Sequence, residues 1–256
     1  MAISHLLLDI EGTTCPVSFV ADVLFPYARR HMAAYLRKQA DDPEMAALVS
    51  ALAQAWQSAA QVEAQALLDA QPKGLVAAAA AGELSPQAAA AAVLPYLTWL
   101  ISHDIKLTPL KDLQGRIWQS GYASGDLVAP LFPDVDTALH RWHQQGLVLA
   151  VYSSGSVPAQ QLLYGHSTSG DLRPLFSHWF DTRIGAKHNT ASYRAIASAM
   201  ECPPSAVLFI SDALAELEAA HKAGMACLFS DRDGNPNRDS GPFARISDYR
   251  TFAPGP

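Results

Sequence analysis

The chain has 256 residues, of which 50% are hydrophobic and 16% are charged. Because this much apolar material can form a packed core, a disordered chain is excluded. The formal net charge is −6 at pH 7, so no basic excess indicates a nucleic-acid partner or an anionic membrane surface. Three scattered cysteines are too few for a disulfide framework or a zinc cluster, and we interpret them as small buried side chains rather than as a thiol nucleophile.

The N-terminal residues run directly into a short apolar strand and lack the basic region that opens a secretory signal. A membrane helix needs roughly 18 or more consecutive apolar residues, and no segment reaches that length. The Ala-rich stretch from Val76 to Val93 comes nearest, but Gly82, Glu83 and Pro86 interrupt it. We therefore expect a cytoplasmic protein that does not contact a membrane.

Several short apolar runs predict buried parallel strands, because near-continuous hydrophobicity over so short a length is typical of a strand covered on both faces. These runs are Leu6–Leu8, Leu147–Tyr152, Ala206–Ile210 and Met225–Phe229. Helical patterns precede the later runs, at Asp134–Gln145, Ser192–Met200 and Ala213–Ala223. This alternation predicts an α/β fold with a doubly wound parallel sheet.

The first strand is separated from the rest of the sheet by a long helical stretch from Phe19 to Ser120, which holds no convincing strand. We expect an inserted all-helical cap over residues 15–120 and an α/β core formed by residues 1–14 and 121–256. Within the cap, the Ala-rich stretch Ala77–Ala92 predicts a pair of surface helices, since alanine forms helices well but offers little to a core.

The return from the cap to the core is expected near Gln119–Asp126. Gly121 and Gly125 interrupt the helical pattern there. Glycine destabilises a helix interior, so these positions predict a hinge between the two parts of the chain.

Two carboxylates, Asp9 and Glu11, directly follow the first predicted strand. A charge at this place is costly unless it is paired or coordinates a metal, so a purely structural turn is the less favoured interpretation. Gly12 allows the backbone to turn sharply after them, and Thr13 and Thr14 add hydrogen-bond donors. The pattern indicates a functional loop at the carboxyl edge of the sheet.

The second predicted strand is followed by Ser153-Ser154-Gly155-Ser156 and by a helix that begins near Pro158. Small hydroxylated residues at a helix N-terminus are typical of an anion-binding site, although any helix cap looks similar. Lys187, in a later loop, offers a cation that balances a phosphate.

Acidic residues also follow the third predicted strand. Asp212 is placed to face Asp9 across the cleft and to complete a site of oxygen ligands that suits Mg²⁺. Glu216 lies four residues further on, so we expect it on the same helical face as Asp212. Glu218 is expected on the solvated face.

An acid, a hydroxyl-rich turn, a lysine and a second acid thus follow successive strand ends, an order that resembles the haloacid dehalogenase superfamily. Within it the chain closely resembles the enolase-phosphatase (acireductone synthase) family of methionine salvage, over residues 5 to 230. The motifs that carry this resemblance are Asp9-Ile10-Glu11-Gly12-Thr13-Thr14, Phe25-Pro26-Tyr27-Ala28, Leu113-Gln114-Gly115-Arg116-Ile117-Trp118, Gly121-Tyr122, Tyr152-Ser153-Ser154-Gly155-Ser156 and Phe180-Asp181-Thr182.

The resemblance implies a Mg²⁺-dependent hydrolase that enolises 2,3-diketo-5-methylthiopentyl 1-phosphate and then removes its phosphate, giving 1,2-dihydroxy-3-keto-5-methylthiopentene. It also implies that Asp9 is the nucleophile, that Ser153 and Ser154 bind the phosphoryl oxygens, and that Lys187 offsets their charge. A phosphorylated small molecule is then the expected partner, and we expect a monomer.

By the same resemblance, Mg²⁺ is held by Asp9, Asp212 and the backbone carbonyl of Glu11. Ordinary phosphatases of the superfamily usually carry aspartate two residues after the nucleophile, whereas this chain carries Glu11. The longer side chain changes where a proton is delivered. Glu11 is therefore the first candidate for the base that removes the carbon-bound proton.

Alternative functions are open at this stage. A plain Mg²⁺-dependent phosphomonoesterase of the same superfamily, acting on another small phosphate ester, is the runner-up, and Glu11 argues against it. Carbon–halogen hydrolysis would use Asp9 without a metal, which leaves Asp212 unexplained. A non-catalytic α/β binding module gives no reason for acids at two strand ends.

Overall fold

The computed structural model describes residues 2–103 and 105–254. The chain forms two compact units, one made of Met1–Val23 and Tyr122–Pro256 and the other of Leu24–Gly121. We call them the α/β unit and the helical unit. Among the described residues, no helix has both the length and the apolar character that crossing a bilayer requires.

The α/β unit contains a six-stranded sheet in the order β3-β2-β1-β4-β5-β6, in which every neighbouring pair is parallel. The strands are β1 (His5–Leu8), β2 (Val148–Tyr152), β3 (Phe176–Phe180), β4 (Val207–Ser211), β5 (Ala226–Ser230) and β6 (Arg245–Ile246). The four strands that the apolar runs predicted are confirmed as β1, β2, β4 and β5. It adds β3 and β6, which no apolar run had indicated.

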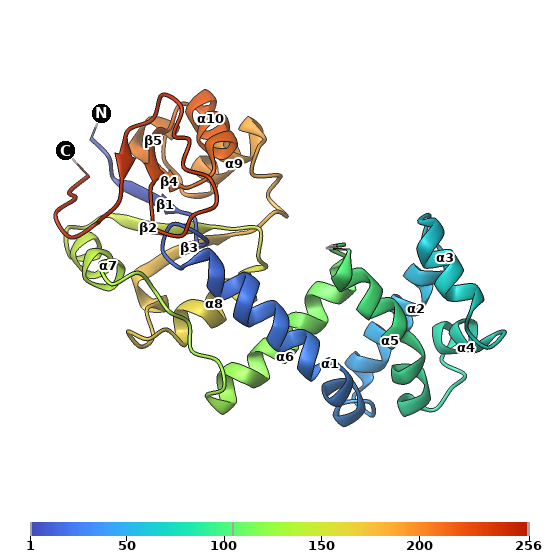
Figure 1. The fold of residues 1–256 in the computed structure, drawn as a ribbon. Helices are drawn as coiled ribbons and strands as arrows, with labels where there is room; N and C mark the ends of the chain where they lie inside the picture. The colour runs from blue at the N-terminus through green and yellow to red at the C-terminus, as the bar shows by residue number, and fades with distance from the viewer. Residues whose placement is uncertain (1, 104, 255–256) are drawn as a thin grey trace. The chain divides into compact units, whose positions relative to one another are not determined.

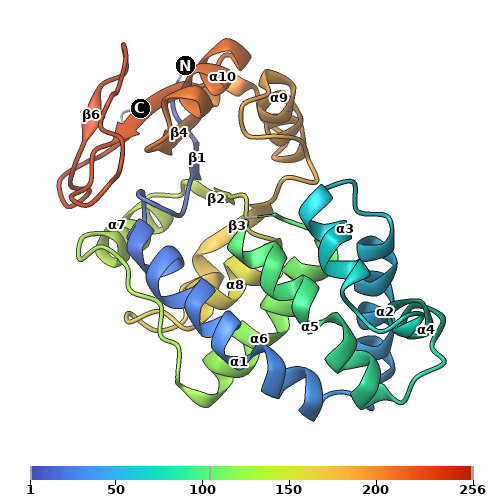
Figure 2. The same ribbon diagram turned by 45° about the vertical axis from the view of Figure 1, so that its right-hand side comes forward.

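Helices cover both faces of this sheet, as Figures 1 and 2 show, so the predicted doubly wound α/β fold is confirmed. The helices are α7 (Val135–Gln144) and α8 (Val157–Gly165) on one face, and α9 (Thr190–Ala199) and α10 (Leu214–Ala223) on the other. Two short 3-10 turns, η2 (Arg173–Leu175) and η3 (Pro204–Ala206), precede β3 and β4. Leu7 and Phe209 of the sheet pack with Ile196 of α9 and Leu217 of α10 in one buried cluster.

The register of the central strands places the residues that follow them at one edge of the sheet. Leu8, at the end of β1, pairs with Val151 of β2 and Ile210 of β4. All three side chains are fully buried. Because the strands are parallel, the chain leaves each of them in the same direction, and the polar residues that come next gather at the carboxyl edge.

The helical unit is built from six α-helices, and no strand occurs in its described part, so the predicted helical insertion is confirmed. A π-helical turn, η1 (Phe19–Leu24), leads into it. The helices are α1 (Phe25–Lys38), α2 (Pro43–Gln57), α3 (Val62–Asp69), α4 (Leu75–Ala81), α5 (Pro86–Ser102) and α6 (Thr108–Ser124). Figure 2 shows α2, α4 and α5 grouped together. The buried rings of Trp56 in α2 and Tyr96 in α5 stack on each other.

The Ala-rich stretch Ala77–Ala92 forms helix, as predicted, but its position on the surface is only partly right. Ala79, Ala90 and Ala92 are buried. The Ser50 hydroxyl of α2 donates a 2.6 Å hydrogen bond to the carbonyl of Ala80. Small side chains let neighbouring helices approach closely, so these alanines form part of the core of the helical unit.

The predicted break at Gly121 is wrong, because α6 continues through this residue to Ser124. A Cβ atom at Gly121 would lie 2.7 Å from ring carbons of Tyr27. Glycine is present here because two parts of the helical unit pack closely, and not because the helix ends. Gly125, with φ of +81°, follows the end of α6, and a hinge at this point stays a prediction.

Candidate active site

Polar side chains follow three neighbouring strands of the sheet. Asp9 comes after β1, Ser153 after β2 and Asp212 after β4, and the order β2-β1-β4 makes these three strands adjacent. Asp9 is 5% exposed and Ser153 is 4% exposed, whereas Asp212 is half-buried. The carboxyl edge of a doubly wound sheet is where ligands bind, so this group forms the candidate site.

The loop after Asp9 is a tight turn. The backbone amides of Thr14 and Cys15 both donate to the carbonyl of Ile10 at 2.9 Å. Gly12 has φ of +67°, and a Cβ atom there would lie 2.1 Å from Oδ2 of Asp212. The glycine therefore has two reasons to be here, since it adopts the left-handed conformation and leaves room for the Asp212 carboxylate.

Lys187 lies among carboxylates. Its Nζ is 2.7 Å from Oδ1 of Asp9 and 2.7 Å from Oε2 of Glu216, and its side chain is 11% exposed. Burial would lower the pKa of Lys187, but the Asp9 and Glu216 carboxylates outweigh burial and raise it. The structure thus brings the predicted cation to the predicted nucleophile, and the lysine stays charged at neutral pH.

Glu216 is a site residue to which the sequence analysis gave no role. It lies in the first turn of α10, and the Ser211 hydroxyl stands 3.0 Å from its Oε2 and 3.1 Å from Oδ2 of Asp9. The expectation that Asp212 shares a helical face with Glu216 is wrong, because Asp212 precedes α10. The four-residue spacing of Asp212 and Glu216 nevertheless indicated a shared place, since both acids lie next to the end of β4.

The electrostatics of the site leave a surplus of negative charge. Burial, and then the charge of Asp9, raise the pKa of Asp212 to about 7. The same causes raise the pKa of Glu216 to about 7. One lysine cannot balance three carboxyl groups, so ionisation of all of them at neutral pH requires a further cation.

The surplus of negative charge and the oxygen donors of the site fit Mg²⁺. The described residues hold no cluster of three or more His, Cys, Asp or Glu side chains arranged around one metal position. Mg²⁺ does not need such a cluster, because it usually binds one or two carboxylates and keeps several waters. Asp9, Asp212 and a backbone carbonyl are oxygen donors of this kind.

The serine turn prepares the N-terminus of α8. The Ser153 hydroxyl accepts a 3.1 Å hydrogen bond from the amide of Gly155, while Ser154 is exposed. Gln160 of α8 donates through Nε2 to the carbonyls of Gly155 and Phe180, both at 2.8 Å. These bonds hold the turn against the end of β3, a strand the sequence analysis did not predict.

Glu11 is half-buried, and its backbone pairs with that of Cys15. Its charge contributes, after larger effects, to the raised pKa values of Cys15 and Asp212. The structure places Glu11 in the loop that follows Asp9 without showing a role for it.

The cysteines offer no nucleophile. Cys15 is fully buried, and burial followed by the charge of Glu11 raises its pKa to about 12. Burial also raises the pKa of Cys227 to about 12 and the pKa of Cys202. All three cysteines are free, and because only a thiolate is nucleophilic, the interpretation as structural thiols agrees with these values.

Comparison with known proteins identifies a family and several relatives that this chain resembles. A family model described as haloacid dehalogenase-like hydrolase matches residues 3–224. The enolase-phosphatase E1 of Synechococcus sp. (strain RCC307) is 47% identical over 250 residues, which cover 97% of this chain and 94% of that protein. The enolase-phosphatase E1 of Prochlorococcus marinus (strain MIT 9313) is 47% identical over 248 residues, 97% of each chain.

Solved structures agree on the architecture. The UTR4 protein (Unknown transcript 4 protein) of Saccharomyces cerevisiae superposes with a TM-score of 0.72 at 29% identity, over 98% of this chain and 100% of that one. CbbY of Rhodobacter sphaeroides, solved in complex with phosphate, shares the fold at a TM-score of 0.56 and 16% identity, over 97% of this chain and 96% of that one. Full-length identity near one half, together with the family match, places the chain: it belongs to the enolase-phosphatase family of the haloacid dehalogenase-like hydrolases.

Proposed function

We propose that this enolase-phosphatase acts in methionine salvage, where it enolises 2,3-diketo-5-methylthiopentyl 1-phosphate and then hydrolyses the phosphate ester to give 1,2-dihydroxy-3-keto-5-methylthiopentene. The observation that carries this proposal is the contact of the buried Asp9 carboxylate with Lys187, next to the acids of β4 and α10. A carboxylate held by one lysine and surrounded by surplus acids suits attack on a phosphate whose charge a metal shares.

In the phosphoryl step, an oxygen of Asp9 attacks phosphorus while the bond from phosphorus to the enol oxygen breaks. The departing oxygen takes a proton, and water then hydrolyses the aspartyl phosphate to release inorganic phosphate and restore the carboxylate. Ser153, Ser154 and the amides that open α8 orient the phosphoryl oxygens, and Lys187 offsets their charge.

Asp9, Asp212 and the backbone carbonyl of Glu11 would hold Mg²⁺. When bound, the metal supplies charge neutralisation at the phosphoryl oxygens and at the enediolate of the first step. The surplus of negative charge around Lys187 supports this assignment, because a bound cation allows Asp9, Asp212 and Glu216 to be ionised together.

The enolase step requires a base for the carbon-bound proton, and we assign it to Glu11. Glu11 follows Asp9 by two residues, and its charge acts on Asp212. After accepting the carbon-bound proton, the same carboxyl group is able to deliver it to the oxygen that leaves in the phosphoryl step.

The helical unit is proposed as the cap, which supplies the side chains that contact the methylthio end of the substrate. The monomeric state and the cytoplasmic location expected from the sequence stay predictions. Size-exclusion chromatography with light scattering tests the first of them, and a dimer in that measurement would contradict it.

The test of the proposed function separates its parts. Phosphate release should stop in excess chelator and return with Mg²⁺, and full activity in chelator would remove the metal from the mechanism.

Asp9→Asn should lower phosphate release by several orders of magnitude, because amide nitrogen and oxygen do not replace the nucleophile. An Asp9→Asn variant with near-normal phosphate release would assign the attack to another group.

Glu11→Gln distinguishes the two candidate activities, because glutamine keeps the length of the side chain but exchanges no proton. Both enolisation, followed by absorbance, and phosphate release should fall if Glu11 serves both steps. If only the second step fails, the enolised phosphate accumulates and is visible by phosphorus NMR. Unchanged rates of both steps would favour the plain phosphomonoesterase.

A further inference from the structure

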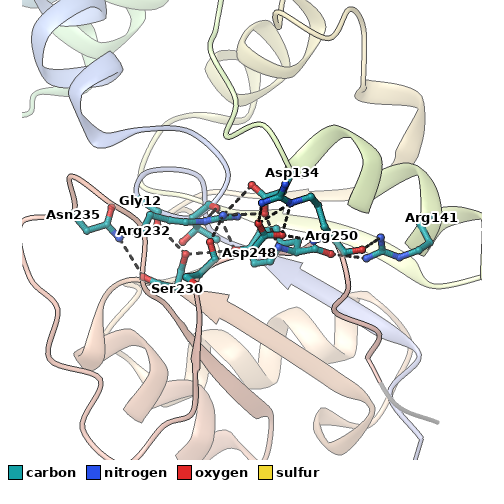
Figure 3. Close-up of polar contacts among 11 residues, drawn as sticks. Gly12, Asp134, Arg141, Ser230, Arg232, Asn235, Asp248 and Arg250 are labelled. Carbon is teal, nitrogen blue, oxygen red and sulfur yellow. Dashed lines mark hydrogen bonds and ion pairs between the residues drawn. The ribbon is translucent and has the colours of Figure 1, made fainter.

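A residue far along the chain, Asn235, reaches the loop that follows Asp9. It stands in the segment after β5 and is 8% exposed. Its Nδ2 donates hydrogen bonds to the carbonyl of Gly12 at 2.9 Å and to the carbonyl of Ser230 at 3.2 Å. Figure 3 shows Asn235, Gly12 and Ser230 together. Since both acceptors are carbonyls, they determine which end of the amide is the nitrogen.

The other end of the amide has no partner. Oδ1 of Asn235 is buried and accepts no hydrogen bond from the protein. It lies 2.9 Å from the point where a Cβ of Gly12 would stand, and Oδ2 of Asp212 lies 2.1 Å from the same point. The two oxygens are therefore within a few ångströms of each other, beside the position that a Cβ of Gly12 would occupy.

When Asp212 is ionised, neither oxygen satisfies the other, because an amide oxygen and a carboxylate oxygen are both acceptors. Leaving a buried acceptor unpaired costs on the order of 1–3 kcal/mol. A group with hydrogens to donate belongs beside both oxygens. Mg²⁺ retains several of its waters when proteins bind it, and such waters donate strongly to nearby oxygens.

We propose that Asn235 is a positioning residue for the metal, whose Oδ1 accepts a hydrogen bond from a water on the Mg²⁺ assigned to Asp9 and Asp212. The inference rests on the proposed function, since it presumes that metal site. Asn235 then has two tasks, in which Nδ2 holds the Gly12 carbonyl and Oδ1 orients a metal-bound water. Neighbours of this outer kind contribute to metal affinity although they do not touch the metal.

The experiment is Mg²⁺ titration by calorimetry on the full-length protein without substrate. Asn235→Ala removes both tasks and should raise the Mg²⁺ dissociation constant about 10- to 100-fold. The matched control is Ser230→Ala, because the Ser230 hydroxyl also donates to the Gly12 carbonyl, at 2.9 Å, but offers no oxygen beside Asp212. Ser230→Ala should leave the dissociation constant near that of the original protein.

Asn235→Asp completes the test, because it keeps an oxygen at the position of Oδ1 and loses the donor to Gly12. It should bind Mg²⁺ at least as tightly as the original protein. Equal losses of affinity in Asn235→Ala and Ser230→Ala, or weaker binding by Asn235→Asp, would reduce Asn235 to a support for the loop and overturn the inference. If the original protein binds no Mg²⁺, the metal site of the proposed function fails, and the inference fails with it.

Discussion

At the scale of single residues, Gly12 controls how closely Asp212 approaches the loop after Asp9. Gly12→Ala places a Cβ where the Asp212 carboxylate now lies, at a backbone φ of +67°. We expect loss of phosphatase activity and a lower free energy of unfolding. The matched control is Gly146→Ala, since Gly146 has φ of +80° but open space around it.

The control should cost about 1–2 kcal/mol, the usual penalty of a left-handed residue with a Cβ, and should retain activity. Gly12→Ala should cost more than the control, because the half-buried Asp212 carboxylate must also move. Urea unfolding and phosphate release measure the two effects. Equal destabilisation in both variants would show that only the backbone conformation matters at Gly12.

Asp212 leads to a pH dependence of stability in the metal-free protein. Its pKa rises from 3.8 to about 7 on folding, through burial first and the Asp9 charge second. The folded protein therefore holds this proton more tightly than the unfolded chain. The resulting stabilisation is fully present below the unfolded value and is lost as the pH rises through the folded value.

In chelator, the free energy of unfolding of the original protein should thus fall relative to that of Asp212→Asn between about pH 4 and about pH 7. The asparagine variant lacks the titrating group, so the difference between the two proteins isolates it. Denaturant unfolding at several pH values measures this difference. A difference that does not vary with pH would contradict the raised pKa of Asp212.

At the scale of elements, α6 contains two glycines in different surroundings. Gly115 has no atom close to the position of a Cβ, whereas a Cβ at Gly121 would lie 2.7 Å from the Tyr27 ring. Alanine is favoured over glycine in a helix by about 1 kcal/mol, so Gly115→Ala should raise the free energy of unfolding by up to that amount. Gly121→Ala should lower it, because overpacking typically costs about 1–3 kcal/mol.

Thermal and urea unfolding of the two variants check this prediction, each serving as the control for the other. Stabilisation by both substitutions would mean that the Tyr27 ring moves aside easily. The same pair explains why the break predicted at Gly121 is wrong. A glycine in a helical pattern has the same appearance in the sequence whether it ends a helix or accommodates a ring from another helix.

At the scale of the whole α/β unit, a buried ion pair ties the segment after β5 to the start of α7. Nη1 of Arg232 lies 2.9 Å from the Asp134 carboxylate, and the guanidinium stands 4.0 Å from the ring centre of Tyr249. Its Nε donates to the carbonyl of Thr13 at 3.3 Å. Figure 3 shows Arg232 between Asp134 and the loop of Gly12.

Asp134→Asn leaves the Arg232 charge buried without its counter-ion and should lower the free energy of unfolding by about 3–5 kcal/mol. Asp248→Asn is the control, since its pair with Arg250 is exposed and such pairs contribute about 0–1 kcal/mol. Chemical denaturation compares the two variants. Similar small effects would mean that solvent reaches Arg232 and solvates its charge.

Much of the fold and of the candidate site followed from local patterns in the chain. The apolar runs of β1, β2, β4 and β5 are visible because a strand covered on both faces must be apolar throughout. Asp9, Ser153 and Asp212 could be predicted as site residues from those runs, because a parallel sheet brings its strand ends to one edge. The motif around Asp9 and Glu11 also indicated the family that the comparisons show.

Other features depend on contacts between segments far apart in the chain, and no local pattern contains them. No continuous apolar run marks β3, because only Phe176 among its residues is buried, and β6 has only two residues. The pairing of Lys187 with Glu216, and the approach of Asn235 to Gly12, arise when separate loops meet at the sheet edge. Burial, charge pairing and the space beside a glycine depend on how these loops contact one another, so only the tertiary structure determines them.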